Sequence, residues 1–152
     1  MKAGAARALS GVSAAAMILA GFAAAGTASA DATENFPIPN RMLHTTCTAE
    51  QIMAAARDVA PVYYKRYMID YNNKSPQIHQ AVQDRINWFY AMDYPGRRSY
   101  AENLATDIYY EKLTFAWPNW SKLFFNNRGV ASRTTDVCEQ YPADDLGVWT
   151  WA

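Results

Sequence analysis

The sequence lacks the features that mark several large classes of protein. Its 152 residues carry 14 basic and 14 acidic side chains, so the formal net charge is zero. A chain without a basic excess does not attract nucleic acid electrostatically. The composition therefore excludes the class of strongly basic nucleic-acid-binding proteins, and nucleic acid is not an expected partner. With only seven glycines and seven prolines, the composition also excludes collagen-like repeats and disordered low-complexity chains. The length suits one ordinary domain.

Motifs for catalysis, nucleotide binding and metal binding are absent as well. There is no Gly-x-Ser-x-Gly, no P-loop, no dinucleotide-binding glycine fingerprint, no His-Glu-x-x-His and no Cys-x-x-Cys. A serine–histidine hydrolase would have to use His44 or His79, the only two histidines. An enzyme would need acid–base residues that are distant in sequence and converge in the fold. The sequence therefore favours a non-catalytic protein without a bound metal.

The first thirty residues differ from everything after them. Lys2 and Arg7 precede an alanine-rich apolar stretch over residues 8–25, which is followed by Ala28-Ser29-Ala30. This is the pattern of a secretory signal peptide with a small-residue cleavage site, although an uncleaved membrane anchor is the alternative. We predict cleavage after Ala30 and a protein that is secreted or associated with the cell envelope. Residues 31–152 then have 12 basic and 14 acidic side chains and no predicted transmembrane segment.

Cys47 and Cys138 are the only cysteines, and both lie in the predicted mature chain. Because export would place them in an oxidising compartment, we expect one disulfide between them. Closing a loop of about 92 residues stabilises a fold by on the order of 4.6 kcal/mol in the chain-entropy model. Two free thiols or an intermolecular pair are the alternatives.

Capping signals and hydrophobic periodicity predict an all-α domain over residues 47–140. Prolines in residues 31–46 predict an extended N-terminal arm before it. Thr48 and Gln51 form a capping box that opens the first helix, which should run to about Tyr71 with a kink or break at Pro61. Its apolar stripe should contain Ile52, Ala56, Val59, Tyr63 and Tyr67.

Two further long helices and a short fourth complete the predicted bundle. Ser75-Pro76 opens a helix to about Met92. Ser99 and Glu102 form a second capping box for a helix towards Ala116, and Asn119–Asn127 should form the short helix that Gly129 terminates. Residues 141–152 read as an irregular C-terminal tail whose Val148, Trp149 and Trp151 suggest docking on the body.

Several of these residues carry a resemblance to a known group of proteins. The alanine-rich leader, the Cys47-Thr48-Ala49-Glu50-Gln51 start, the tyrosine- and tryptophan-rich helices and the late cysteine resemble a family of small uncharacterised exported proteins of mycobacteria and related actinobacteria. The resemblance covers about Cys47 to Tyr141 and implies no known activity. The architecture is also distantly similar to the mycobacterial haemophores, exported haem-binding proteins with an early and a late cysteine.

Aromatic density is the feature that exceeds ordinary core needs. Phe22 aside, all of the 5 Trp, 10 Tyr and 6 Phe lie in residues 31–152. Tyr63, Tyr67 and Tyr71 recur at intervals of four on one predicted helix, and His79 lies at the edge of the next helix's apolar stripe. These four side chains could line a groove for a flat apolar ligand, with a phenol or imidazole ligating haem iron. Haem is therefore the candidate cofactor, although filling a core remains the commoner use of such residues.

Two other binding classes stay open. Trp117, Trp120, Trp149 and Trp151 could stack on sugar rings of a cell-envelope glycan. The C-terminal Trp149-Thr150-Trp151 or the proline-rich arm could instead dock on a protein partner. The sequence thus predicts an exported non-catalytic binding or envelope-associated protein whose ligand it does not identify.

Charged pairs give weaker candidates. Asp107 and Glu111 are four residues apart on the predicted third helix, where they could hold a divalent cation, but spacing places no further ligand beside them. Arg97-Arg98 could bind an anion, although exposed loop arginines are more often solubilising charge. Asp144-Asp145 read as solvated acids of the tail.

Overall fold

The computed structural model describes residues 37–150 of the chain. The predicted signal peptide, its cleavage site, residues 31–36 of the arm and Trp151 lie outside the described residues. Within them the chain forms helices and no strand, which confirms the predicted all-α class. The count differs, because the described chain has eight α-helices and two short 3₁₀ segments where three long helices and a short fourth were predicted.

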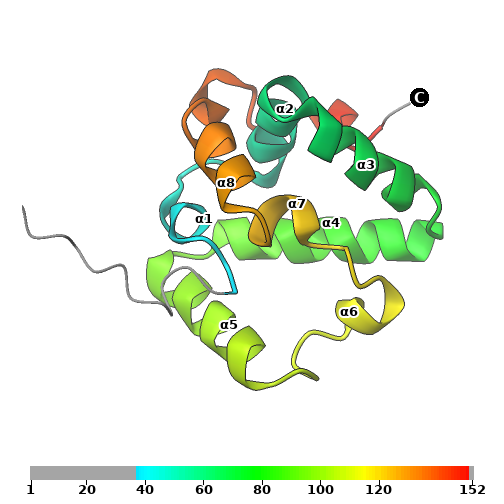
Figure 1. Cartoon of the computed structure of the whole chain (residues 1–152), viewed down its shortest axis with the longest axis vertical. Coiled ribbons are helices and arrows are strands. Elements are labelled where there is room, and N and C mark those ends of the chain that lie inside the picture. The colour runs from blue at the N-terminus through cyan, green and yellow to red at the C-terminus, as the bar shows by residue number, and fades with distance from the viewer. Residues whose placement is uncertain (1–36, 151–152) are drawn as a thin grey trace, which may run out of the picture.

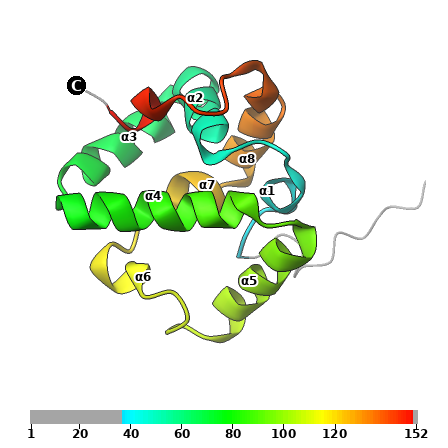
Figure 2. The same cartoon turned by 180° about the vertical axis from the view of Figure 1, so that it is seen from behind.

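The helices are mostly short. They are α1 (Asn40–His44), α2 (Ala49–Val59), α3 (Pro61–Asn72), α4 (Pro76–Ala91), α5 (Tyr94–Thr106), α6 (Leu113–Ala116), α7 (Lys122–Phe125) and α8 (Arg128–Thr135), followed by the 3₁₀ segments η2 (Cys138–Gln140) and η3 (Leu146–Trp149). In both views α4 crosses the middle of the molecule, with α2 and α3 on one side and α5 and α6 on the other (Figures 1 and 2).

The first predicted helix is present as two. The Thr48 side chain accepts from the Gln51 backbone N–H and the Gln51 side chain accepts from the Thr48 N–H, which confirms the capping box of α2. The helix stops at Val59, and Pro61 occupies the first position of α3. Proline is well tolerated at that position because its missing N–H has no intrahelical partner there. The predicted break at Pro61 is confirmed.

This break changes which tyrosines are buried. Ala60 has non-helical backbone angles (φ −140°, ψ 48°), so the phase of α3 is offset from that of α2. Tyr64, Tyr67 and Tyr71 face the core, whereas Tyr63 is 45% exposed. The predicted stripe was therefore wrong at Tyr63, because it assumed one unbroken helical period, whereas its last member, Tyr67, is buried as predicted.

Helix α4 follows its prediction closely. Ser75 caps it, Pro76 begins it and Ala91 ends it. Its predicted apolar stripe is Ile78, Val82, Ile86 and Phe89, of which Ile78 is partly buried and the other three are fully buried.

The predicted third helix was displaced. Helix α5 begins at Tyr94, because the Asp93 side chain accepts from the Gly96 N–H and so supplies the N-cap. Asp93-Tyr94-Pro95-Gly96 is therefore a helix start, where a turn was predicted, and Ser99 lies inside the helix. The helix ends at Thr106, so residues 107–112 are not helical and only Leu113–Ala116 continue as α6.

The two ends of the predicted domain also differ. Within the predicted extended arm, Asn40–His44 form α1, and Ile38, Met42 and Leu43 are buried against the body. Near the other end Asn127 caps α8 through a bond from the Val130 N–H, and Gly129 lies in that helix's first turn. Gly129 was predicted to terminate a helix, yet glycine is also accommodated in a first turn. The predicted short fourth helix, Asn119–Asn127, is present only over Lys122–Phe125, as α7.

A disulfide and side-chain bonds tie the C-terminal segment to the start of α2. Cys47 and Cys138 are bonded, with their Cα atoms 6.1 Å apart, which confirms the predicted pairing. The Thr48 hydroxyl donates to the Ala143 carbonyl (2.8 Å), and the Gln51 amide donates to the Tyr141 carbonyl (2.9 Å). Val148 and Trp149 are buried, so this tail packs on the body. No helix within residues 37–150 has both the length and the apolar character needed to span a membrane.

Candidate functional site

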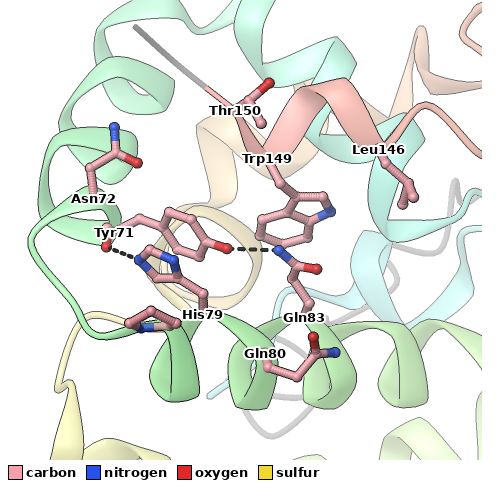
Figure 3. Close-up of a pocket in the computed structure, with 9 residues that line it drawn as sticks. Tyr71, Asn72, His79, Gln80, Gln83, Leu146, Trp149 and Thr150 are labelled. Carbon is pink, nitrogen blue, oxygen red and sulfur yellow. Dashed lines mark hydrogen bonds between the residues drawn. The ribbon is translucent and has the colours of Figure 1, made fainter.

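An open pocket lies where the end of α3, the first half of α4 and η3 meet. It encloses about 740 Å³. Its lining consists of Tyr71, Asn72, Pro76, His79, Gln80, Gln83, Leu146, Trp149 and Thr150. Figure 3 shows the α4 side chains on one side of this space, Tyr71 and Asn72 of α3 on a second, and the η3 segment on a third. We call this space the amide pocket, after its three carboxamide side chains.

Tyr71 and His79 form the inner corner of the amide pocket. Their rings stack with centroids 4.0 Å apart and an interplanar angle of 13°. Nε2 of His79 lies 2.7 Å from the Tyr71 carbonyl oxygen, and the Tyr71 hydroxyl accepts from Nε2 of Gln83 at 2.7 Å (Figure 3). Burial raises the pKa of Tyr71, and the hydrogen bond from Gln83 offsets only part of that effect. The phenol is therefore neutral at physiological pH.

The amide pocket carries no Asp, Glu, Lys or Arg in its lining. Its polar groups are the carboxamides of Asn72, Gln80 and Gln83, the Thr150 hydroxyl and the His79 ring. A carboxamide offers both a donor NH₂ and an acceptor oxygen. Gln80 is exposed and donates to Asp84 at 2.7 Å. The lining thus combines carboxamide and other polar groups with apolar surface and contains no carboxylate, ammonium or guanidinium.

A second, smaller pocket lies between α3 and α7 and encloses about 190 Å³. One face of α3 supplies Tyr63, Arg66, Tyr67 and Asp70, and the chain around α7 supplies Asn119, Lys122, Leu123, Asn126 and Asn127. We call it the cationic pocket, because two of its three charged side chains, Arg66 and Lys122, are positive and only Asp70 is negative.

The floor of the cationic pocket is fixed by hydrogen bonds. The Tyr67 hydroxyl donates to the Trp120 carbonyl at 2.8 Å. Burial raises the pKa of Tyr67 well above 10.0, with smaller contributions from Tyr71 and Asp70. A phenolate, the form that binds ferric iron, is therefore strongly disfavoured at this position.

Asp70 at the edge of the cationic pocket is already satisfied. Its Oδ2 accepts from Nε1 of Trp117 (2.6 Å) and from Asn119 (3.3 Å), and Lys74 lies 3.2 Å from its Oδ1. Partial burial raises the pKa of Asp70, but these three interactions outweigh it and hold the pKa below 3.8.

The structure divides the predicted ligand-binding set between the two pockets. Tyr71 and His79 line the amide pocket, while Tyr63 and Tyr67 line the cationic pocket. The three tyrosines all belong to α3, where each interval of four residues turns the side-chain direction by about 40°, so Tyr63 and Tyr71 point about 80° apart. The four residues therefore do not line one groove.

The predicted tryptophan platforms are mostly part of the core. Trp117 and Trp120 are 1% and 2% exposed, and their indole N–H groups donate to Asp70 and Thr114. Neither can stack on an external sugar ring, so that expectation was wrong for both. Trp149 is 5% exposed and donates to Glu50, yet its ring edge contributes to the amide pocket.

The charged pairs also have other roles than those considered. Asp107 and Glu111 do not share a helical face, because residues 107–112 are not helical. Glu111 is buried, accepts from the Tyr100 hydroxyl (2.8 Å) and pairs with Arg85 (3.2 Å). Asp107 is exposed and accepts from the Tyr109 N–H. Between residues 37 and 150 no group of three or more His, Cys, Asp or Glu could hold a metal ion.

Arg97 is a structural residue, where an exposed loop arginine was expected. It is 5% exposed, and its guanidinium donates to backbone carbonyls of two separate segments. These are the carbonyls of Met42, Leu43 and Thr45 at the end of α1, and those of Phe89 and Tyr90 in α4. Arg97 is therefore unavailable to an external anion.

Sequence reasoning missed the polar lining of both pockets. Gln80 and Gln83 lie three residues apart on α4 and only one of them borders the apolar stripe, so they look like ordinary surface amides. Thr150 and Leu146 reach the site through the C-terminal segment, whose path the sequence does not indicate. Arg66 and Lys122 are 56 positions apart, and no local pattern connects them.

Comparison with known proteins identifies the family. The profile of a family described as Domain of unknown function (DUF5078) matches residues 33–151. The chain belongs to the DUF5078 family. The expectation of an uncharacterised family is thereby confirmed, and the match spans both pockets and both cysteines. No curated protein matches the sequence.

Proposed function

We propose that this DUF5078 protein is an exported, non-catalytic binding protein whose amide pocket takes an uncharged, hydroxyl-rich ligand, namely a neutral glycan of the cell envelope. The observation that carries the proposal is the lining of the pocket: three carboxamides, the Thr150 hydroxyl and the His79 ring, with no carboxylate, ammonium or guanidinium.

The chemistry of the lining suits hydroxyl groups. A sugar hydroxyl donates one hydrogen bond and accepts others, and a carboxamide presents both complementary groups. A charged ligand would lose its hydration in this pocket without gaining a counter-ion, which is unfavourable. Leu146 is 69% exposed at the rim, where its side chain can cover the C–H face of a sugar ring.

Haem suits the amide pocket less well. Nε2 of His79 is engaged with the Tyr71 carbonyl, the Tyr71 hydroxyl is engaged with Gln83, and burial keeps that phenol protonated by raising its pKa. Ligation would have to break these bonds. The propionates of haem would also find no lysine or arginine in the lining.

Matched glutamine variants test the glycan proposal. We would titrate a panel of neutral hexose and pentose oligosaccharides into the oxidised protein, residues 31–152, by isothermal calorimetry. Gln80→Ala and Gln83→Ala should each weaken binding about two- to tenfold, because each removes a hydrogen bond worth about 0.5–1.5 kcal/mol. Gln77→Ala is the control, since Gln77 is exposed on the same helix and outside the pocket.

A histidine variant separates the glycan and haem readings. His79→Phe keeps a ring that can stack on Tyr71 but removes both nitrogens. Oligosaccharide binding should persist in this variant. A saturable Soret shift on haemin titration that His79→Phe abolishes, together with no oligosaccharide binding up to about 1 mM, would overturn the proposal in favour of haem.

A further inference from the structure

The cationic pocket has a composition opposite to that of the amide pocket. Two cations, Arg66 and Lys122, line it from opposite walls, one on α3 and one on α7. Neither forms an ion pair with any acid within residues 37–150. The one acid in the lining, Asp70, is engaged with Lys74, Trp117 and Asn119. The pocket therefore holds uncompensated positive charge.

The neutral groups of this pocket add donors on the same space. Asn126 and Asn127 lie in the wall beside Lys122, and Asn127 also caps the N-terminus of α8 through its Oδ1. The positive end of the α8 dipole consequently lies at the rim, where it favours a negative group. Each asparagine also carries an NH₂ group that can donate to an oxyanion.

An apolar surface completes the pocket. Tyr63 is 45% exposed and lies one helical turn before Arg66, while Leu123 is 3% exposed and closes the inner side. The pocket volume of about 190 Å³ lies below the range of about 300–1,000 Å³ that is typical of small-molecule sites. A ligand of this site must therefore be small, well below the size that pockets of drug-like ligands accommodate.

We propose that the cationic pocket binds a small organic oxyanion, a phosphate monoester or carboxylate with a compact apolar or aromatic body. Arg66 would bind two oxygens of the anion in the fork geometry of a guanidinium, and Lys122 would bind it from the opposite wall. The apolar body would lie against Tyr63. This site shares no lining residue with the amide pocket, so the inference does not depend on the glycan proposal.

Three small probes test the site by two-dimensional ¹H–¹⁵N NMR of the oxidised protein, residues 31–152. Phenyl phosphate and benzoate should bind saturably and shift the signals of Arg66, Asn126 and Asn127. Benzyl alcohol, which has the same ring without the charge, should not. Arg66→Gln and Lys122→Gln should each weaken phenyl phosphate binding about tenfold or more, because each removes a charge-assisted hydrogen bond.

Lys65→Gln is the matched control, because it removes the same charge from the adjacent position outside the pocket. Equal losses in Lys65→Gln and Arg66→Gln would show attraction by net charge alone and would overturn the proposal. A second result would also overturn the proposal: no saturable binding of phenyl phosphate or benzoate, together with no binding to vesicles that contain phosphatidic acid. Binding to those vesicles alone, lost in Arg66→Gln, would assign the anion to a lipid headgroup.

Discussion

At the scale of single residues, one buried cation joins segments that are far apart in sequence. The Arg97 guanidinium donates to carbonyls at the end of α1 and at the end of α4, more than fifty and about eight residues away. Arg97 therefore satisfies carbonyls at both helix ends at once. Burial lowers the pKa of Arg97, yet arginine remains charged because its ordinary pKa is so high.

Removing this guanidinium should be costly. Arg97→Ala would leave several buried carbonyls unsatisfied and open a void between α1, α4 and α5. We expect the free energy of unfolding to fall by about 3 kcal/mol or more, measured by urea denaturation. Arg128→Ala, at an exposed position of α8, should change it by no more than about 0.5 kcal/mol. Equal effects of the two substitutions would contradict the structural role of Arg97.

Asp70 predicts a specific pH dependence. Its pKa is lowered in the folded state, so its interactions stabilise the fold above the ordinary pKa of 3.8 and are lost as the pH falls through the folded value. Asp70→Asn should therefore be less stable than the natural protein at pH 7, and the difference should shrink in acid below pH 3.8. Thermal melts between pH 7 and pH 2.5 would check this, and a difference that grows in acid would refute it.

At the scale of elements, the sequence predicts those features that local chemistry decides. The capping box of Thr48 and Gln51, the break at Pro61 and the Ser75-Pro76 start of α4 each depend on residues within a few positions of one another. Each signal therefore reads correctly without tertiary information. The disulfide could be predicted because only two cysteines are available to form it, and the structure confirms it.

The remaining elements depend on choices that local patterns leave open. Asp93-Tyr94-Pro95-Gly96 suits both a turn and a helix start, and the Asp93 cap together with the burial of Arg97 in the following turn favours the helix. Gly129 likewise suits a helix end or a first turn. The candidate site was found in part, since Tyr71 and His79 do share a pocket, but its amides come from the long-range approach of η3 to α4. The burial of Trp117 and Trp120 is a tertiary property of the same kind.

The start of α2 gives a prediction at this scale. The Thr48 hydroxyl accepts from Gln51 and donates to the Ala143 carbonyl, so it both caps α2 and holds the tail. Thr48→Ala should lower the free energy of unfolding by about 1–2 kcal/mol, as for other N-cap losses. Thr106→Ala, whose hydroxyl bonds only to carbonyls of its own helix, should cost about 0.5 kcal/mol or less. Urea titration compares the two, and equal losses would show that the cap contributes nothing special.

At the scale of the whole molecule, the tail and the disulfide hold the wall of the amide pocket in place. The disulfide fixes Cys138 to the start of α2, the bonds from Thr48 and Gln51 hold residues 141–143, and Trp149 donates to the buried Glu50. The η3 wall of the amide pocket thus depends on contacts to α2, a helix that contributes no residue to the pocket lining. Stability and ligand binding should therefore be coupled through this segment.

Replacing both cysteines tests that coupling. The variant Cys47→Ala with Cys138→Ala should lose about 4–5 kcal/mol of unfolding free energy, because the closed loop of about 92 residues no longer restrains the unfolded chain. Hydrogen exchange should show residues 141–150 losing protection before α4 does. An unchanged unfolding midpoint, or equal loss of protection in both segments, would contradict this view.

The most direct test of the central claim is NMR mapping of a neutral oligosaccharide onto the protein. Side-chain amide signals of glutamine and asparagine are resolved from the backbone signals, so the carboxamides that line the amide pocket can be followed directly. We predict saturable shifts in the signals of Asn72, Gln80 and Gln83 and in the backbone of Thr150, with Gln77 unchanged. Saturable shifts that instead centre on another face of the molecule, or none for any neutral oligosaccharide, would contradict the assignment of the amide pocket as a glycan site.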